Sequence, residues 1–234
     1  IILLIIYYLV DSFYYKKEVI QNTNDILDNH PITIDGLNNI FLLKKMIIDN
    51  EGKILYPSRK INSIYFDNQN FSMYNQSIEG IVPRKKIRIR IYNQEFTNCK
   101  DVKKEIKITA VEGRYKTSEN IKNFSQVMNL GILDRNYGIC IPVLNVTYKR
   151  SYYLLKNIRI TFDENIYYKK ITNKQVSKFS TFDNYCIVEL KYNSDKFINF
   201  CNTFFPFQRI RFSKYCRGIE FTEINYCNDL DSFT

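Results

Sequence analysis

The clearest pattern along the chain is a strict alternation of basic and aliphatic residues from Lys86 to Tyr92. A period of two residues is typical of a β-strand and puts all of the basic side chains on one face. Neighbouring side chains on one face lie about 7 Å apart, so each adjacent pair of cations repels by about 2 kcal/mol at an effective dielectric of about 20. The pattern therefore predicts a strand over residues 85–92, whose basic face is either solvated or in contact with an anion.

Other predicted strands repeat this division into a charged and an apolar face. They are expected at residues 61–66, 102–109, 143–153, 158–163 and 185–192, and 102–109 is expected to form a hairpin with 85–92. The residues that share the polar faces of three of these strands are Lys103, Glu105 and Lys107, then Arg159, Thr161 and Asp163, then Glu189 and Lys191. Periodicity leaves two interpretations open: the solvated outer face of a sandwich, or the lining of a closed barrel whose apolar outside is covered by helices.

Helices are predicted at residues 12–29, 36–50, 118–130 and 194–204, and Ser118 is expected to cap the third of them. The apolar run over residues 1–10 is expected to be a buried strand. We find neither a linker nor an internal repeat, which predicts a single domain over residues 1–234. Many antiparallel strands with a few helices beside them indicate an α+β fold with a barrel or a strongly curved sheet.

The formal net charge of +10 indicates a polyanionic partner: nucleic acid, an anionic membrane or a phosphate-rich small molecule. Nucleic acid is disfavoured, because the cations alternate with aliphatic residues and have no aromatic stacking platform between them. The six cysteines have no zinc-like spacing and His30 is the sole histidine, so we expect free thiols in a reducing, cytoplasmic setting. The opening ten apolar residues are too few to span a bilayer and lack the features of a signal peptide.

Taken in order, these segments resemble the VTC domain, the polyphosphate polymerase branch of the triphosphate tunnel metalloenzyme (CYTH-like) superfamily. The resemblance covers about residues 60–222. The matching stretches are 63–67, 84–92, 105–107, 148–150, 159–163, 188–192 and 211–218. It implies an α+β fold in which an eight-stranded antiparallel β-barrel forms a tunnel with flanking helices. It also implies transfer of the γ-phosphate of ATP to a growing polyphosphate chain, with Mn²⁺ or Mg²⁺ as cofactor and a membrane protein as a further partner.

The resemblance also assigns roles to individual residues. The implied phosphate clamps, which would all point toward one axis, are Arg88, Arg90, Arg150 and Arg159, with Lys107 beside them. A contact near the tunnel end is implied for Arg211, Ser213 and Lys214, of which Lys214 is grouped with the clamps as catalytic. Lys116 and Lys191 are expected to bind phosphate as well. Glu189 is implied as the metal ligand, with Glu105 assisting it.

Two departures from the family pattern bear on the activity. Ile5 and Ile6 stand where the family's first strand carries charged residues, so the first strand is expected to be aberrant or to come from a truncated N-terminus. Residues 35–58 look like an insertion.

Three functions therefore stay open: a polyphosphate polymerase, a triphosphate or polyphosphate hydrolase of the same fold, and a non-catalytic module that binds polyphosphate or inositol phosphates. Glu189 favours an enzyme, because a pure anion receptor has no use for a carboxylate beside its cations.

Overall fold

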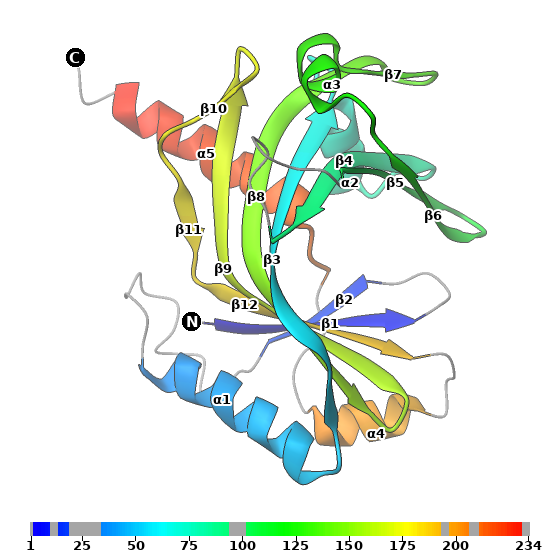
Figure 1. Ribbon diagram of the computed structural model, residues 1–234, viewed down its shortest axis with the longest axis vertical. Coiled ribbons are helices and arrows are strands. Elements are labelled where there is room, and N and C mark those ends of the chain that lie inside the picture. Colours follow the sequence, from blue (N-terminus) through cyan, green and yellow to red (C-terminus); the bar gives the residue numbers. More distant parts are fainter. Residues whose placement is uncertain are drawn as a thin grey trace. The chain divides into compact units, whose positions relative to one another are not determined.

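The computed structural model describes residues 2–9, 14–18, 34–93, 102–192, 197–205 and 211–230, and it is an α+β structure (Figure 1). Its strands are β1 (Ile2–Leu9), β2 (Tyr14–Glu18), β3 (Lys53–Asp67), β4 (Arg84–Tyr92), β5 (Lys103–Ala110), β6 (Gly113–Asn120), β7 (Ile132–Asp134), β8 (Gly138–Leu155), β9 (Ile158–Thr172), β10 (Gln175–Val176), β11 (Thr181–Asp183) and β12 (Tyr185–Tyr192). Its helices are α1 (Ile34–Asp49), α2 (Ser72–Glu79), α3 (Phe124–Leu130), α4 (Phe197–Phe204) and α5 (Lys214–Leu230).

The strands form one hydrogen-bonded sheet whose main path runs β2-β1-β12-β9-β8-β3-β4-β5-β6. Strand β1 is parallel to β12, whereas the pairs β12–β9, β3–β4, β4–β5 and β5–β6 are antiparallel. This confirms the predicted α+β class, the antiparallel character of the sheet and the hairpin of β4 with β5. The predicted closed barrel of eight strands is not found, because the path holds nine strands and, among the described residues, has free ends at β2 and β6.

The chain divides into two compact units, and the three long strands β3, β8 and β9 contribute to both. Unit 1 comprises residues 1–59, 148–166 and 183–212, and unit 2 comprises residues 60–147, 167–182 and 213–234. Each unit has its own set of buried apolar side chains. The following description therefore treats each unit by itself.

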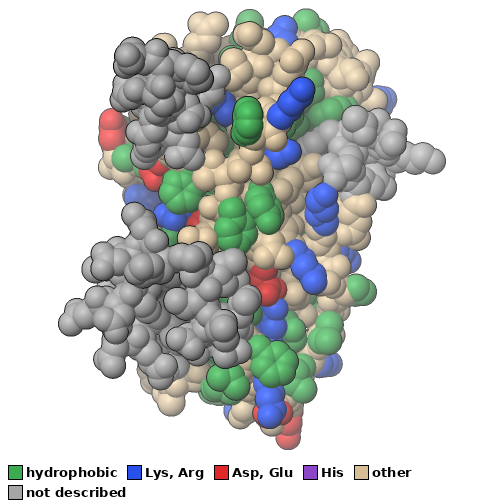
Figure 2. Space-filling model, turned by 90° about the vertical axis from the view of Figure 1, so that its left-hand side faces the viewer, with side chains coloured by type: hydrophobic (Ala, Val, Ile, Leu, Met, Phe, Trp, Pro, Cys, Tyr) green, Lys and Arg blue, Asp and Glu red, His purple; other side chains and the backbone are tan. Residues whose placement is uncertain are grey.

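Basic side chains are common on the surface. Figure 2 shows Lys and Arg at several places on one face of the molecule, in keeping with the net charge of +10. Lys53, Arg135 and Lys149 are among the exposed basic residues. Since a positive surface of this kind attracts any polyanion, net charge alone cannot mark a specific site. The informative cations are those that the fold buries.

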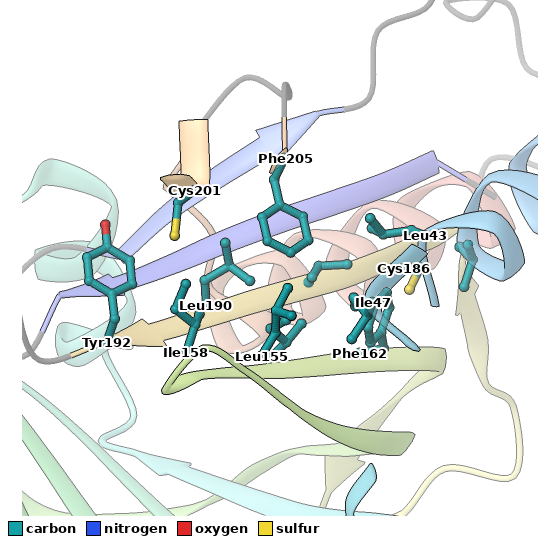
Figure 3. Packing of buried hydrophobic residues seen from close by; sticks show 13 residues of the cluster. Leu43, Ile47, Leu155, Ile158, Phe162, Cys186, Leu190, Tyr192, Cys201 and Phe205 are labelled. Atoms are coloured by element: carbon teal, nitrogen blue, oxygen red, sulfur yellow. The ribbon is translucent and has the colours of Figure 1, made fainter. Parts of the chain in front are cut away.

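In unit 1, helices cover the apolar face of β9 and β12. Ile40, Leu43 and Ile47 of α1 pack with residues of β9, β12 and α4 in one buried cluster (Figure 3). On β9 the buried apolar residues occupy alternate positions from 158 to 162, so Arg159, Thr161 and Asp163 fall on the opposite face. Helix α1 was expected at residues 36–50 and is confirmed.

In unit 2, Asp67 at the end of β3 holds the starts of two helices. Its carboxylate accepts hydrogen bonds from the backbone N–H groups of Met73 and Tyr74 in α2, at 3.1 and 2.9 Å. It also accepts one from the hydroxyl of Tyr215 in α5, at 2.6 Å. Gly218 lets α5 pack closely, because a Cβ atom there would lie 2.6 Å from side-chain atoms of both Leu144 and Tyr168. Position 218 therefore has no room for a larger residue.

Three predictions of secondary structure need correction. Residues 14–18 form β2, paired with β1, rather than the start of a helix, and most of the predicted helix 12–29 lies outside the described residues. Residues 113–120 pair with β5 as strand β6, so the helix expected from Ser118 begins only at α3, where the side chain of Asn123 accepts a hydrogen bond from the N–H of Gln126. In both cases pairing with a distant strand outweighs local helical spacing. Helix α5 was not predicted.

Candidate phosphate-binding clusters

The charged faces of the strands are buried, which rules out a solvated outer face for them. Glu105 and Asp163 are 2% and 1% exposed, and Arg90 and Glu189 are 7% and 9% exposed. Ionised groups are almost never buried to this extent unless they are paired. The structure pairs them in two clusters, one in each unit.

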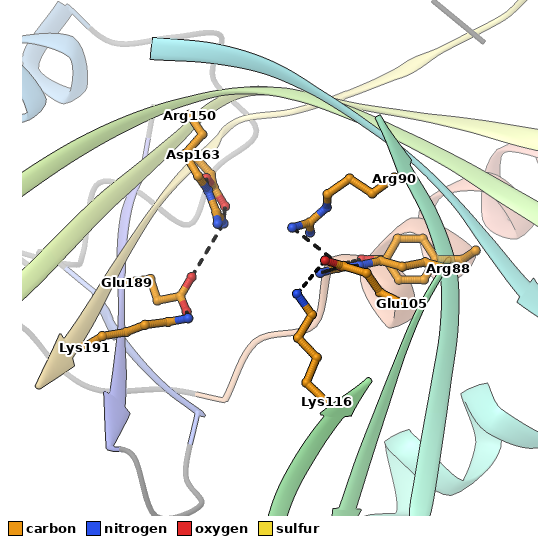
Figure 4. A network of polar contacts seen from close by, with 9 residues as sticks. Arg88, Arg90, Glu105, Lys116, Arg150, Asp163, Glu189 and Lys191 are labelled. Atoms are coloured by element: carbon orange, nitrogen blue, oxygen red, sulfur yellow. Dashed lines mark hydrogen bonds and ion pairs between the residues drawn. The ribbon is translucent and has the colours of Figure 1, made fainter. Parts of the chain in front are cut away.

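The first cluster, in unit 2, is centred on one carboxylate and is called here the Glu105 cluster. It comprises Glu105 with Arg88, Arg90 and Lys116 (Figure 4). Arg88 Nε donates to Glu105 Oε2 at 2.7 Å, Lys116 Nζ lies 2.5 Å from Oε1, and Arg90 Nη1 lies 3.7 Å from Oε2. The strand register explains the arrangement, because Arg88, Glu105 and Ser118 are direct cross-strand partners on β4, β5 and β6.

Three cations around one buried carboxylate change its ionisation. Burial raises the pKa of Glu105, but the positive charges of Arg88 and Arg90 and the hydrogen bond from Lys116 outweigh this and hold the pKa well below its usual range. Glu105 is therefore a permanent anion at neutral pH. Because three cations meet one carboxylate, the cluster retains two positive charges, and it can accept further negative charge.

Tyr65 links this cluster to the start of α5. Arg88 Nη1 donates to the hydroxyl of Tyr65 at 3.2 Å, and the ring of Tyr65 stacks on that of Tyr215 with centroids 5.2 Å apart. Burial raises the pKa of Tyr65, but the charges of Arg88, Arg90 and Lys214 together lower it. The charge of Lys214, the first residue of α5, therefore acts on the hydroxyl of Tyr65 together with the two arginines.

Lysines form a second row of the same face. Lys86, Lys107 and Lys116 are successive cross-strand partners on β4, β5 and β6. Lys86 Nζ donates to the hydroxyl oxygen of Ser213 at 2.7 Å, and this oxygen also accepts from the N–H of Cys216 in the first turn of α5. Ser213 therefore caps α5 and joins it to the lysine row. Arg211 lies nearby in sequence and is exposed.

The second cluster, in unit 1, contains two carboxylates and is called here the Arg150 cluster. It comprises Arg150, Asp163, Glu189 and Lys191 (Figure 4). The guanidinium of Arg150 forms a two-pronged pair with Asp163, with Nε to Oδ1 at 2.5 Å and Nη2 to Oδ2 at 2.6 Å. Its contact with Glu189 is longer, at 3.5 Å, and Lys191 Nζ lies 3.2 Å from Glu189.

The pKa directions in this cluster reflect the same geometry. Burial lowers the pKa of Arg150, but Asp163 more than compensates and the pKa is raised well above its usual value. The pKa of Lys191 is lowered, because burial and the charge of Arg159 outweigh the attraction of Glu189. Arg150 is therefore committed to Asp163, whereas the Lys191–Glu189 pair is the looser one.

The two predicted metal ligands differ in how well they fit a divalent cation. Mg²⁺ and Mn²⁺ prefer oxygen ligands and are commonly held by one or two carboxylates together with substrate phosphates. Glu105 already has short contacts to Arg88 and Lys116, so a cation would have to displace them. The ion pairs of Glu189 with Arg150 and Lys191 are longer, at 3.5 and 3.2 Å, which favours Glu189 for the role. Within the described part of the chain, no group of three or more His, Cys, Asp or Glu residues is arranged to hold a metal ion.

The structure thus brings most of the predicted residues together in two groups. Arg88, Arg90, Glu105 and Lys116 meet in one cluster, and Arg150, Glu189 and Lys191 meet in the other. Arg159 is the cross-strand partner of Lys191. The convergence of all four arginines on one axis stays a prediction, because two of them belong to each unit.

The register also places the aberrant first strand. Strand β1 pairs with β12 so that Ile6 is aligned with Glu189, while Ile5 is aligned with Val188. Position 6 is therefore the one that shares a row with the charged face of β12. In the neighbouring strand β2, Lys16 is the partner of Ile6. The sequence predicted a helix at residue 16, so the alignment of Lys16 with Ile6 was not foreseen.

Several site residues had no role in the sequence-based assignment. Asp163 was placed on the charged face of its strand, yet its pairing with Arg150 was not foreseen. Tyr65 and Lys86 were likewise unassigned, although each shares a strand face with Arg88 or its partner. Two hydroxyls, those of Ser63 and Thr161, are 1% exposed and have no hydrogen-bond partner in the structure. The alternation of residues between the two faces of a strand was the signal that could have identified these residues, because each lies on the charged face of its strand.

Two further observations concern the helices and the cysteines of the described residues. No helix in the described residues is long and apolar enough to cross a membrane. The cysteines that the structure describes, Cys140, Cys186, Cys201 and Cys216, are buried free thiols. Burial raises the pKa of Cys140 to about 11, so this thiol is protonated at neutral pH. The described cysteines behave as core residues.

Comparisons with solved structures gave weak likenesses. A protein from Bacillus halodurans described as a "putative adenylate cyclase" is 11% identical, with a TM-score of 0.49 over 80% of this chain and 92% of that chain. One of the same description from Vibrio parahaemolyticus is 13% identical, with a TM-score of 0.41 over 74% and 87%. The Pct1 RNA triphosphatase of S. pombe is 12% identical, with a TM-score of 0.19 over 79% and 87%. At TM-scores below 0.5, these likenesses carry no inference about fold or activity.

Comparisons of sequence are more decisive. No curated protein matches the chain significantly. The family model of the VTC domain, however, matches residues 24–139 and 114–223, which together span residues 24–223. These residues include both clusters and every strand from β3 to β12. The match confirms the resemblance drawn from the strand motifs, and the chain belongs to the VTC domain family.

Proposed function

We propose that this protein is a polyphosphate polymerase that transfers the γ-phosphate of ATP to a growing polyphosphate chain. The observation that carries the proposal is the Glu105 cluster, in which three cations surround a single buried carboxylate; Arg88 and Arg90 are largely buried and Lys116 is half exposed. Such an excess of positive charge at partly buried groups is costly unless an anion binds there. Membership of the VTC domain family, whose resemblance implies this chemistry, supports the choice of polyphosphate as that anion.

Each group has a part in the proposed reaction. Phosphoryl transfer needs little covalent chemistry from the protein; it needs positioning of the reactants and neutralisation of the charge on the phosphate oxygens. Arg88 and Arg90 would clamp phosphates from one strand face, with Lys107 and Lys116 beside them. At the start of α5, Lys214 and Ser213 would contact the same anion, and Arg211 is proposed to bind phosphate as well. Guanidinium groups suit this task because they donate parallel hydrogen bonds to phosphate.

The Arg150 cluster would hold the metal ion and a further phosphate. Glu189 is the proposed ligand of Mn²⁺ or Mg²⁺, since its ion pairs with Lys191 and Arg150, at 3.2 and 3.5 Å, are longer than those that Glu105 makes with Arg88 and Lys116. When bound, the ion would neutralise charge on the phosphates. Arg150, Arg159 and Lys191 would supply positive charge on the same face. Asp163 would keep the guanidinium of Arg150 in place through its two short hydrogen bonds.

A product assay tests this proposal directly. The purified full chain is incubated with ATP and Mn²⁺, and the products are resolved on a polyacrylamide gel stained for polyphosphate. A ladder of long chains would support polymerase activity. Release of phosphate from ATP or tripolyphosphate without a ladder would favour the hydrolase. Binding of tripolyphosphate without turnover would favour a non-catalytic phosphate-binding module, the candidate that the pairing of Glu189 with Arg150 and Lys191 also fits.

The role of Glu189 has its own test. In the Glu189→Ala variant, we expect Mn²⁺-dependent turnover to be abolished and tripolyphosphate binding to be unchanged or tighter, because a negative charge leaves a cationic surrounding. Glu164→Ala is the matched control: Glu164 lies on β9 beside Asp163 but pairs with Lys44 at 2.6 Å, outside the cluster. Turnover of Glu189→Ala within a few-fold of the parent at limiting Mn²⁺ would remove Glu189 as the metal ligand.

A further inference from the structure

Two neighbouring polar groups on β9 are buried without a hydrogen-bond partner. One is the hydroxyl of Thr161, a residue that is 1% exposed, and the other is Nε of Arg159, two positions earlier on the same strand face. A buried donor without a partner is rare in folded proteins, because it loses its hydrogen bonds to water and gains nothing in return. Two of them side by side indicate a polar group that binds between them.

The surroundings determine the chemistry of that group. Thr161 is the cross-strand partner of Glu189, and Arg159 is that of Lys191. Arg159 and Lys191 are donors that carry positive charge and have no capacity to accept a hydrogen bond. The group that binds here must therefore accept hydrogen bonds and tolerate two neighbouring cations. An oxyanion meets both requirements.

The spacing suits a single phosphate group. Side chains two positions apart on a strand lie about 7 Å apart. A tetrahedral phosphate can span this distance, because it accepts hydrogen bonds of about 2.7–2.9 Å through oxygens on opposite sides. The hydroxyl of Ser63 in unit 2 is also buried without a hydrogen-bond partner, but its cross-strand neighbour Arg90 is engaged in the Glu105 cluster. The inference therefore rests on Thr161.

We infer that the Thr161 hydroxyl and Arg159 Nε donate hydrogen bonds to one and the same phosphate group of the bound polyphosphate. This makes Thr161 a phosphate-binding residue in addition to the cations. The inference rests on the proposed function, because it requires that the chain binds phosphate. The Thr161 hydroxyl would be an uncharged donor among charged residues. It would strengthen phosphate binding without increasing the dependence of the affinity on salt concentration.

Isothermal titration calorimetry of the full chain with inorganic tripolyphosphate tests this. Thr161→Val keeps the shape of the side chain and removes the hydroxyl, so we expect a loss of affinity of about 5- to 10-fold, which corresponds to one lost hydrogen bond. Thr161→Ser keeps the hydroxyl and should bind within about twofold of the parent. The melting temperature of ligand-free Thr161→Val should be unchanged or higher, because the removed hydroxyl has no partner. Thr161→Ala removes the same hydroxyl with a smaller side chain and must also lose affinity.

Thr222→Val is the matched control, because the hydroxyl of Thr222 is buried but donates to the carbonyl oxygen of Gly218 at 2.8 Å. It should lower the melting temperature and leave the affinity unchanged. Parental affinity in both Thr161→Val and Thr161→Ala would overturn the inference, as would a loss of stability like that of Thr222→Val with no change in affinity. A parent protein that binds no tripolyphosphate would overturn the proposed function and this inference with it.

Discussion

The Glu105 cluster and the Arg150 cluster use similar residue types but differ in their balance of charge. In the first, Arg88, Arg90 and Lys116 share one carboxylate. In the second, Arg150 is held by Asp163 through two short hydrogen bonds, and a second carboxylate, Glu189, lies beside it. The first cluster therefore retains positive charge that can attract a phosphate. In the second, the charge of Arg150 is largely balanced by Asp163.

This difference shows that an arginine on a strand face does not have a fixed role. The number and distance of its carboxylate partners decide whether the guanidinium is held for the fold or remains available for a ligand. Arg88 has hydrogen-bonding capacity for both Glu105 and Tyr65, and Glu105 keeps other cations if Arg88 is removed. Asp163, by contrast, accepts two short hydrogen bonds from Arg150. The sequence assigned all four arginines as phosphate clamps, but the structure divides them into at least two groups that differ in their carboxylate partners.

The largest effect that separates the clusters should be on stability. In Arg150→Met, the buried carboxylate of Asp163 loses its two-pronged partner, and we expect the free energy of unfolding to fall by about 3–5 kcal/mol. In Arg88→Met, Arg90 and Lys116 still neutralise Glu105, so a loss of about 1–2 kcal/mol is expected. Urea denaturation followed by circular dichroism measures both. Equal losses in the two variants would mean that the clusters do not differ as described.

A smaller effect should appear in the pH dependence of stability. The folded-state pKa of Glu105 lies below its unfolded value of about 4.3, so the stabilisation is fully present above that pH and is lost as the pH falls toward the folded pKa. Glu105→Gln should therefore be less stable than the parent at pH 7, and the difference should shrink as the pH falls below about 4.3. Thermal unfolding between pH 7 and pH 3 measures this. A difference that stays constant over the range would contradict the assignment of a permanently ionised Glu105.

Much of the fold was accessible from the sequence, because alternation over 85–92, 102–109, 158–163 and 185–192 depends only on the period of a strand. The polar residues of each cluster follow from the same parity. The ends of the elements and the pairing of the strands were harder to predict from the sequence. Residues 118–120 and 14–18 lie in strands β6 and β2, rather than in the predicted helices, because they pair with β5 and β1. The number of strands and the openness of the sheet depend on contacts between distant segments, which no local pattern records.

The site was predictable in its members but not in its energetics. Sequence reasoning expected Glu189 to bind the metal ion and Glu105 to assist it, but it could not tell how closely each carboxylate is paired with cations. The contact distances, 2.5 Å from Glu105 to Lys116 and 3.2 Å from Glu189 to Lys191, distinguish the two carboxylates. Cross-strand neighbours set these distances, and strand pairing fixes which residues those neighbours are.

The central claim is that buried cations of the clusters, rather than the net charge of +10, bind phosphate. Calorimetric titration of tripolyphosphate into Arg88→Met and Arg135→Met tests it most directly, since both changes remove one positive charge from unit 2 and Arg135 is exposed. We expect Arg88→Met to lose about 10- to 150-fold in affinity, the equivalent of one charge-assisted contact, and Arg135→Met to stay within about twofold of the parent. Equal losses in the two variants would contradict the claim, because binding would then follow net charge alone.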